Sequence, residues 1–420
     1  MNKARIINLV CLILAGEIIF SLPFHITRYF RPTFLETFGL SNAALGDIFA
    51  LYGVIAMLAY FPGGLLADRF SVRRLLSFSL FATAAGGLYL ATMPGTAGLR
   101  GLFAYWGMTT ILLFWAALLR ATREWGGSNQ QGLAFGLLDG GRGLAAALAA
   151  SCAVALLAAY SGDETAALAG PARERGLKAV IYFYSGLTAT VGLLCWFFVA
   201  ETSAAAAERP SGQLVTRVLG VLRNPCVWFQ SAIVLCAYCA YKGLDNYGVY
   251  LVDVLEVSEL RAAELMALSA YLRPLGAIAA GLIADRYRPS QVICWTFLAL
   301  LGIYTVLATQ APTGIRFEII AINLGVSFLA VFALRGIYFA LLHEGRVAAF
   351  QTGTAIGLVS VIGFTPDVFF YAVGGRLLDR NPGLIGHQHY FLMLAGIACL
   401  GLVAALLLYY FTRRQTPAVS

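Results

Sequence analysis

The fold is decided by a motif that occurs twice, as Gly-Leu-Leu-Ala-Asp-Arg at residues 64–69 and as Gly-Leu-Ile-Ala-Asp-Arg at residues 281–286. The same offset of 217 residues aligns Asp47 with Glu264, which are both acidic. Shorter matches follow in the same order along the chain, with slightly different offsets: 117–120 with 332–335, and 132–136 with 353–357. Because these matches occur in the same order along both halves of the chain, they indicate two halves that run in the same direction and share one fold.

The composition excludes a soluble protein. Of the 420 residues, 60% are hydrophobic and only 12% are charged, whereas soluble domains contain about 25% charged residues. A helix needs about 20 apolar residues to cross a bilayer. Apolar segments of this order occur at 6–33, 44–66, 75–94, 101–120, 132–159, 177–200, 226–252, 262–284, 291–309, 317–340, 351–375 and 389–411. The sequence therefore predicts an all-α membrane protein with twelve transmembrane helices in two pseudo-twofold-related six-helix bundles.

The polar segment 201–225 divides the chain near its middle. We expect it to be a cytoplasmic linker between an N-terminal bundle, residues 1–200, and a C-terminal bundle, residues 226–420. Lysine and arginine prefer cytoplasmic loops, and they predominate on the side that holds both chain ends, where Arg5 and Arg413 lie. Both termini are therefore predicted to be cytoplasmic. In proteins with parallel repeats, the binding site usually lies between the halves, near the middle of the bilayer.

Several classes of function lack the sequence features that they need. No hydrophilic stretch is long enough for a separate catalytic domain, and the phosphate-binding pattern G-x-x-x-x-G-K-[ST] is absent. The net charge of +8 comes mostly from arginines, which short membrane loops explain without a nucleic-acid partner. Cys236 and Cys239 form a C-x-x-C pair in an apolar run, and we interpret them as small helix-packing residues. We expect no cofactor and no metal.

The repeated motif resembles the signature of the major facilitator superfamily, G-x-L-A-D-R-x-G-R-R, which joins the second and third helices in that family. The matching residues are Gly64, Asp68, Arg69 and Arg73 in the first copy and Gly281, Asp285 and Arg286 in the second. Ser71 stands where the family has a glycine, and Val72 stands where it has the next arginine. Within the superfamily, the stretch 131–143 is similar to a bacterial subset labelled YihN-like.

The resemblance implies a secondary transporter of the bacterial inner membrane that works as a monomer by alternating access, in which two bundles rock around a central site. It also implies that the signature closes the cytoplasmic side in one state. Asp68 would then face the end of a neighbouring helix, with Arg69 and Arg73 in an ion-pair network. A loop that carries both signs of charge can hold an interface with two stable states. Positive-inside topology is the alternative for the arginines, but it does not explain Asp68.

Ionisable side chains inside the predicted helices point to a functional site, because charges are costly in a bilayer. Six cations and four anions lie there: Arg28, Arg120, Arg142, Lys242, Arg273 and Arg335 against Glu17, Asp139, Asp245 and Asp367. Arginine binds carboxylate or phosphate through two parallel hydrogen bonds, so the surplus of cations favours an anionic substrate. We predict substrate contacts at Arg142 and Arg273, one from each half, and also at Lys242 and Arg28.

Proton-coupling roles are predicted for five residues: Glu17, Asp139, Asp245, Asp367 and His25. Glu17 lies about 18 Å along the first helix, near the middle of the bilayer, and no opposite charge lies within one helical turn of it. Burial at that depth favours the neutral carboxyl and allows it to exchange protons. Asp367 follows Pro366, whose missing amide loosens the local helix.

Some of these residues have alternative roles. Asp139 and Arg142 are three residues apart, as are Lys242 and Asp245, so each pair could neutralise itself on one helix face. His25 could relay protons or simply hydrogen-bond a neighbouring helix.

The sequence therefore predicts a transporter that moves a small organic anion across a bacterial inner membrane by proton symport. Anion exchange and proton-driven export of an amphipathic compound are alternatives within this class. A polytopic membrane enzyme or a sensor that does not transport its ligand would be a different class. We expect no enzyme, since His343-Glu344 lacks the second histidine of H-E-x-x-H, the pattern of zinc proteases. The expected partners are an anionic small molecule, protons and lipid.

Overall fold

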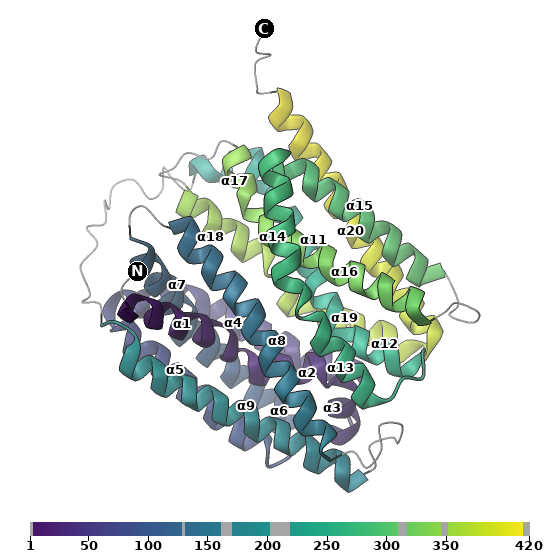
Figure 1. The fold of residues 1–420 in the computed structure, drawn as a ribbon. Coiled ribbons are helices and arrows are strands. Elements are labelled where there is room, and N and C mark those ends of the chain that lie inside the picture. The colour runs from purple at the N-terminus through teal and green to yellow at the C-terminus, as the bar shows by residue number, and fades with distance from the viewer. Residues whose placement is uncertain are drawn as a thin grey trace. The chain divides into compact units, whose positions relative to one another are not determined.

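The computed structural model describes residues 3–127, 131–160, 170–201, 219–309, 317–345 and 352–414. Every regular element in these ranges is a helix (Figure 1). Most of the predicted linker, residues 202–218, and the side chain of Asp68 lie outside the described residues.

Contacts divide the chain into two compact units. Unit 1 consists of Met1–Ala206, Asp245–Tyr271 and Tyr371–Gly375, and unit 2 consists of Ala207–Leu244, Leu272–Phe370 and Arg376–Ser420. This division follows contacts in the structure, whereas the predicted bundles follow the sequence repeat. Two short segments of the second half thus belong to the same unit as the first half.

Unit 1 contains the first helices of the chain. Its elements are α1 (Lys3–Ile18), the π-helix η1 (Ser21–His25), α2 (Ile26–Tyr29), α3 (Arg31–Phe38), α4 (Asn42–Arg69), α5 (Val72–Leu90), α6 (Thr96–Gly107), the π-helix η2 (Met108–Trp115), α7 (Ala116–Gly126), α8 (Gln131–Ala158), α9 (Gly170–Phe198), α12 (Tyr247–Asp253) and α13 (Glu259–Ser269).

Unit 2 contains most of the second half. Its elements are α11 (Pro225–Gly243), α14 (Leu272–Arg286), α15 (Pro289–Thr309), α16 (Phe317–Ile337), the 3₁₀-helix η4 (Tyr338–Ala340), α17 (Leu341–Glu344), α18 (Thr352–Gly363), most of α19 (Pro366–Arg380) and α20 (Leu384–Arg414). A further 3₁₀-helix, η3 (Leu244–Asn246), lies where the chain passes from unit 2 into unit 1.

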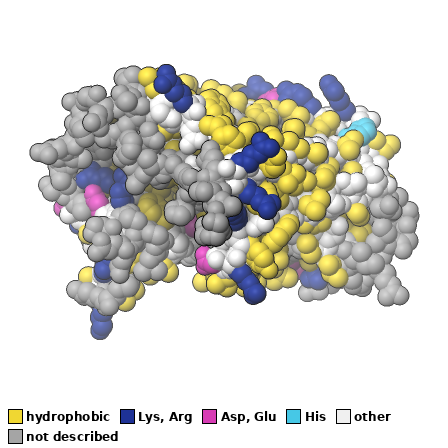
Figure 2. Space-filling model, turned by 90° about the horizontal axis from the view of Figure 1, so that it is seen from above, with side chains coloured by type: hydrophobic (Ala, Val, Ile, Leu, Met, Phe, Trp, Pro, Cys, Tyr) yellow, Lys and Arg dark blue, Asp and Glu magenta, His cyan; other side chains and the backbone are white. Residues whose placement is uncertain are grey.

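All twelve predicted apolar segments are helical, and the predicted all-α membrane fold is confirmed. Eleven helical stretches of the described chain are long and apolar enough to cross a membrane. The segment that is not among them, predicted at 75–94, is α5. The first turn of this helix contains Arg73 and Arg74, which lower its mean hydropathy. Large apolar side chains such as Leu58 and Phe197 are exposed, and hydrophobic side chains cover much of the described surface in Figure 2.

The first membrane-spanning stretch is broken rather than continuous. α1 ends at Ile18, and Pro23 lies in the π-helix that follows, where its missing amide cannot support a regular helix. The hydroxyl groups of Ser21 and Thr188 donate to the Ile18 carbonyl at 2.6 and 3.5 Å. Neighbouring hydroxyls thereby satisfy the freed backbone group, as a break inside a membrane requires. Broken helices and π-turns often mark functional sites.

Candidate functional site

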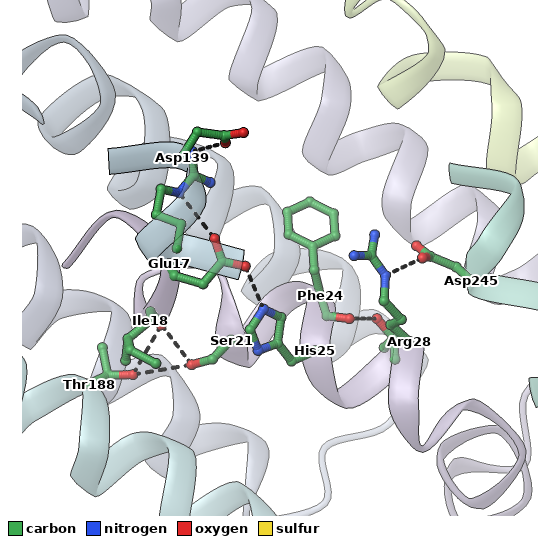
Figure 3. Close-up of polar contacts among 11 residues, drawn as sticks. Glu17, Ile18, Ser21, Phe24, His25, Arg28, Asp139, Thr188 and Asp245 are labelled. Atoms are coloured by element: carbon green, nitrogen blue, oxygen red, sulfur yellow. Dashed lines mark hydrogen bonds and ion pairs between the residues drawn. The ribbon is translucent and has the colours of Figure 1, made fainter. Parts of the chain in front are cut away.

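Glu17 is the centre of a buried charged cluster in unit 1 (Figure 3). Arg142 Nε donates to Glu17 Oε2 at 3.0 Å, and His25 Nε2 lies 3.3 Å from Glu17 Oε1. Asp139 Oδ1 lies 3.9 Å from Arg142 Nη1. Glu17 is therefore not the isolated carboxyl that its sequence neighbours suggest, because its partners come from α8 and from beyond the helix break.

Close packing of α1 and α8 brings Arg142 to Glu17. The two helices lie side by side in Figure 1. A Cβ atom on Gly16 would lie only 3.2 Å from Arg142 Cδ, and one on Gly141 would lie 2.7 Å from the Ile13 side chain. The stem of Arg142 thus lies across a glycine of α1, which places its guanidinium beside the carboxylate one residue further along.

The helix break brings His25 to the same carboxylate. Eight residues separate Glu17 from His25, which in an unbroken helix corresponds to about 12 Å along the axis. The π-helix η1 changes this spacing, and the His25 ring also packs edge-on against Tyr29 and Tyr184, with centroid distances of 5.4 and 5.9 Å. The predicted proton site is therefore a carboxylate–histidine pair inside unit 1.

Two aromatic rings lie next to Arg142. The Arg142 guanidinium carbon is 6.0 Å from the Phe20 ring centroid and 5.8 Å from that of Trp115. The two rings pack edge-to-face, with centroids 6.1 Å apart. Sequence analysis did not identify either ring, because Phe20 lies in the helix break and Trp115 lies at the end of the π-helix η2.

Arg28 and Asp245 form a buried ion pair in unit 1 (Figure 3). The Tyr371 hydroxyl donates to the second carboxylate oxygen of Asp245, and the Tyr371 ring stacks on Phe49 at 4.3 Å. Arg28 and Asp245 are 217 residues apart, which is the offset of the sequence repeat. Equivalent positions of the two halves therefore contact each other. A predicted substrate contact and a predicted proton site thus neutralise one another.

In unit 2, Lys242 contacts Asp367. Lys242 Nζ lies 2.8 Å from Asp367 Oδ1, and the Tyr238 hydroxyl donates to both carboxylate oxygens at 3.1 and 3.0 Å. The sequence also allows a pair between Lys242 and Asp245. In the structure α11 ends at Gly243, between these two residues, and they contact Asp367 and Arg28, respectively.

Two further cations lie near the helix breaks of unit 2. The Arg335 guanidinium carbon lies 3.8 Å from the Tyr241 ring centroid, within the distance of a cation–π interaction. Arg273, predicted in the middle of the eighth helix, is buried at the second position of α14, just after the break between α13 and α14.

The signature residues lie around the α4–α5 turn and the end of α14. Arg73 pairs with Glu201, and Arg120 Nη1 donates to the Ala67 carbonyl at 2.6 Å. The remaining described residues have open surroundings: Gly64 and Gly281 have free space at the Cβ position, and Arg69, Asp285 and Arg286 are exposed.

Comparison with known proteins identifies the family. The pattern of the Major Facilitator Superfamily matches residues 13–364. Inner membrane protein YqcE of Escherichia coli (strain K12) is 30% identical over 98% of this chain and 96% of its own length. Inner membrane protein YihN of the same organism is 28% identical over 94% of this chain and 93% of its own length. A probable nitrate/nitrite antiporter, NarK1 of Thermus thermophilus, is 26% identical over 80% of this chain and 78% of its own length.

A solved structure supports the fold independently. The bacterial homologue of the human lysosomal transporter Spinster superposes with a TM-score of 0.76 at 14% identity, over 99% of this chain and 98% of that chain. The predicted family and its YihN-like subset are thus confirmed. This chain belongs to the Major Facilitator Superfamily and is a multi-pass secondary transporter of the inner membrane, as its matches to that family and to YqcE and YihN show.

Proposed function

We propose that the protein carries a small organic anion across the inner membrane together with a proton, by alternating access. One observation supports this most directly: Arg142, a natural anion ligand, hydrogen-bonds Glu17, which also contacts His25. The cluster joins a cation that can hold a substrate to a carboxylate that can hold a proton.

Competition between ionised Glu17 and the substrate anion for Arg142 would couple proton binding to anion binding. While Glu17 is ionised, it neutralises the guanidinium and occupies one of its donors. When Glu17 takes up a proton, directly or through His25, it releases Arg142. The guanidinium then keeps only the more distant, partly exposed Asp139 as a counter-ion and can bind the substrate through paired hydrogen bonds. Proton binding and anion binding then favour each other by the same factor, because coupling between two sites is reciprocal. No covalent bond of the substrate changes.

Groups on three elements around Glu17 take part in this balance. α8 supplies Arg142 and Asp139, η1 supplies His25, and α9 supplies Tyr184, which packs against the His25 ring. Apolar replacement of a buried ion pair is often neutral or stabilising, so stability alone does not account for such a cluster. A transport site in which Arg142 exchanges one anionic partner for another does account for it.

Asp139 supports an aqueous route to this cluster. Its side chain is 44% exposed, and it lies within the candidate membrane span Ala134–Ala158. An ionised carboxylate that faced hydrocarbon at this depth would be costly. We infer that this face of α8 borders water, through which both proton and substrate reach Arg142.

The other predicted residues have supporting roles in this proposal. Three further cations contact the substrate as the protein changes state: Arg28, Lys242 and Arg273. In the structure, Asp245 neutralises Arg28 and Asp367 neutralises Lys242. The signature residues, including Asp68, Arg69 and Arg73, close the cytoplasmic side. In this proposal both termini are cytoplasmic, and the protein works as a monomer.

Anion exchange is the second candidate. The Thermus relative is named as a probable nitrate/nitrite antiporter, and an exchanger would use Arg142 to bind two anions in turn. In that case, the protonation of Glu17 would not be needed for transport.

The test uses purified protein, first in a thermal-stability screen of anionic, zwitterionic and cationic metabolites, then in liposomes with the stabilising compound. Symport predicts that an inward proton gradient drives uptake in wild type. It also predicts that Glu17→Gln abolishes this dependence while anion exchange persists. Glu264→Gln, in an exposed ion pair with Arg261, is the matched control and should behave as wild type.

The outcomes separate the candidates. Uptake that ignores the proton gradient but requires a counter-anion would replace symport with exchange. If no anion stabilises the protein, or if Arg142→Ala leaves the stabilisation unchanged, the anion proposal is wrong.

A further inference from the structure

We propose that the transported anion carries a flat apolar or aromatic group, which packs against the rings of Phe20 and Trp115 when its charged end binds Arg142. The inference rests on the proposed function, because it takes Arg142 as the anion ligand. It extends the proposed function by naming the chemical class of the uncharged part of the substrate.

The two rings flank the cation directly. They lie 6.0 and 5.8 Å from the Arg142 guanidinium carbon and belong to different elements, the break after α1 and the end of η2. A carboxylate on the guanidinium would therefore have an aromatic surface beside it. Both side chains are half-buried, so each retains surface that a ligand can cover.

The Asp139 side chain gives the cluster an exposed side. The Arg142 side chain is 12% exposed and that of neighbouring Asp139 is 44% exposed. Since an ionised carboxylate does not face hydrocarbon without a large cost, the exposed surface next to Arg142 faces water or substrate. Phe20 and Trp115 border this charged group through their contacts with the guanidinium.

The hydroxyl groups at the helix break are already engaged. The side chains of Ser21 and Thr188 are fully buried and bond the Ile18 carbonyl, where they maintain the helix break. A sugar acid needs hydrogen-bond partners for each of its hydroxyls. Among the described contacts of the Arg142 guanidinium, the neighbours other than carboxylates are the two rings, which are largely apolar. The geometry therefore favours phenylacetate-like anions over gluconate-like ones.

The test compares three carboxylates of equal charge, phenylacetate, acetate and gluconate, by ligand-dependent stability and by competition with uptake. Phenylacetate should bind wild type about tenfold more tightly than acetate or gluconate, as expected for one aromatic contact with its buried area. Trp115→Ala should remove this preference, so that phenylacetate and acetate bind with similar affinity, whereas Trp115→Phe and Phe20→Leu should retain most of the preference. Trp196→Ala, at a tryptophan that is 47% exposed on α9, is the matched control and should retain the full preference.

Two results would overturn the inference. The first is gluconate binding as tightly as phenylacetate in wild type. The second is an unchanged preference in Trp115→Ala, or in Trp115→Leu if the alanine variant does not fold. In both cases, loss of all anion binding in Arg142→Ala would still support the proposed function. Anion binding that does not depend on Arg142 would instead refute the proposed function itself.

Discussion

A single charged side chain inside the membrane acquires its role from its partners. Glu17 alone would be a candidate proton carrier of any kind, but with Arg142 and His25 as neighbours it becomes a group whose ionisation controls an anion ligand. Likewise, the sequence predicts Arg28 as a substrate contact, yet Asp245 neutralises it in the fold, and Tyr371 donates to the second oxygen of that carboxylate. Residue type identifies the candidates, and the contacts decide between them.

The Glu17–Arg142 pair predicts strong coupling in a double-mutant cycle. Glu17→Leu alone should lower the free energy of unfolding by about 3–5 kcal/mol, because it leaves a buried guanidinium without its main counter-ion. The double variant Glu17→Leu/Arg142→Leu should recover most of this loss, since both charges are then absent. Denaturant unfolding in mixed micelles measures the cycle.

The exposed pair Arg261–Glu264 serves as the control and should show a coupling energy below about 1 kcal/mol. Additive effects at Glu17 and Arg142 would contradict the buried pairing, because interaction energies vanish only between independent sites.

Helices of this protein determine the site through their breaks and close approaches. The break after α1 turns His25 back to Glu17, and α11 ends at Gly243, between Lys242 and Asp245. On α4, Gly46 lies directly against the backbone of α19: a Cβ atom there would be 2.3 Å from the Tyr371 carbonyl oxygen. The tyrosine that hydrogen-bonds Asp245 is thus held by a contact that only glycine permits.

Gly46→Ala should therefore displace α19 from α4 and weaken the hydrogen bond from Tyr371 to Asp245. We expect a loss of about 1–3 kcal/mol in the free energy of unfolding, as for other overpacked contacts. Gly64→Ala on the same helix meets open space, and it should be neutral or stabilising by up to about 1 kcal/mol, because alanine has the higher helix propensity. Equal effects of the two substitutions would show that this close contact does not form.

At the scale of the whole molecule, one tertiary contact joins two residues that the sequence repeat makes equivalent. Arg28 and Asp245 occupy equivalent positions of the two halves and bind each other within unit 1.

A charge exchange tests this arrangement. Arg28→Asp alone should lower the free energy of unfolding by about 3–5 kcal/mol, since two buried carboxylates then face each other. Adding Asp245→Arg should restore more than half of the loss, although Tyr371 then lacks its acceptor. Lys178→Glu in the partly exposed pair with Glu174 should cost less than about 1 kcal/mol. Failure of the second substitution to restore stability would argue against a direct pair.

The sequence by itself determined the number and positions of the apolar helices, the repeat, the family and the residues that carry charge into the membrane. These features depend on local hydropathy and on motifs, which each segment specifies alone. Only the tertiary structure decided which charges meet: Glu17 with Arg142 and His25, Arg28 with Asp245, and Lys242 with Asp367. These pairings depend on which helices are neighbours and on where a helix breaks. The spacing of three residues between Lys242 and Asp245 would have predicted contact only in a continuous helix. In this protein, a short 3₁₀ turn gives each of them another partner.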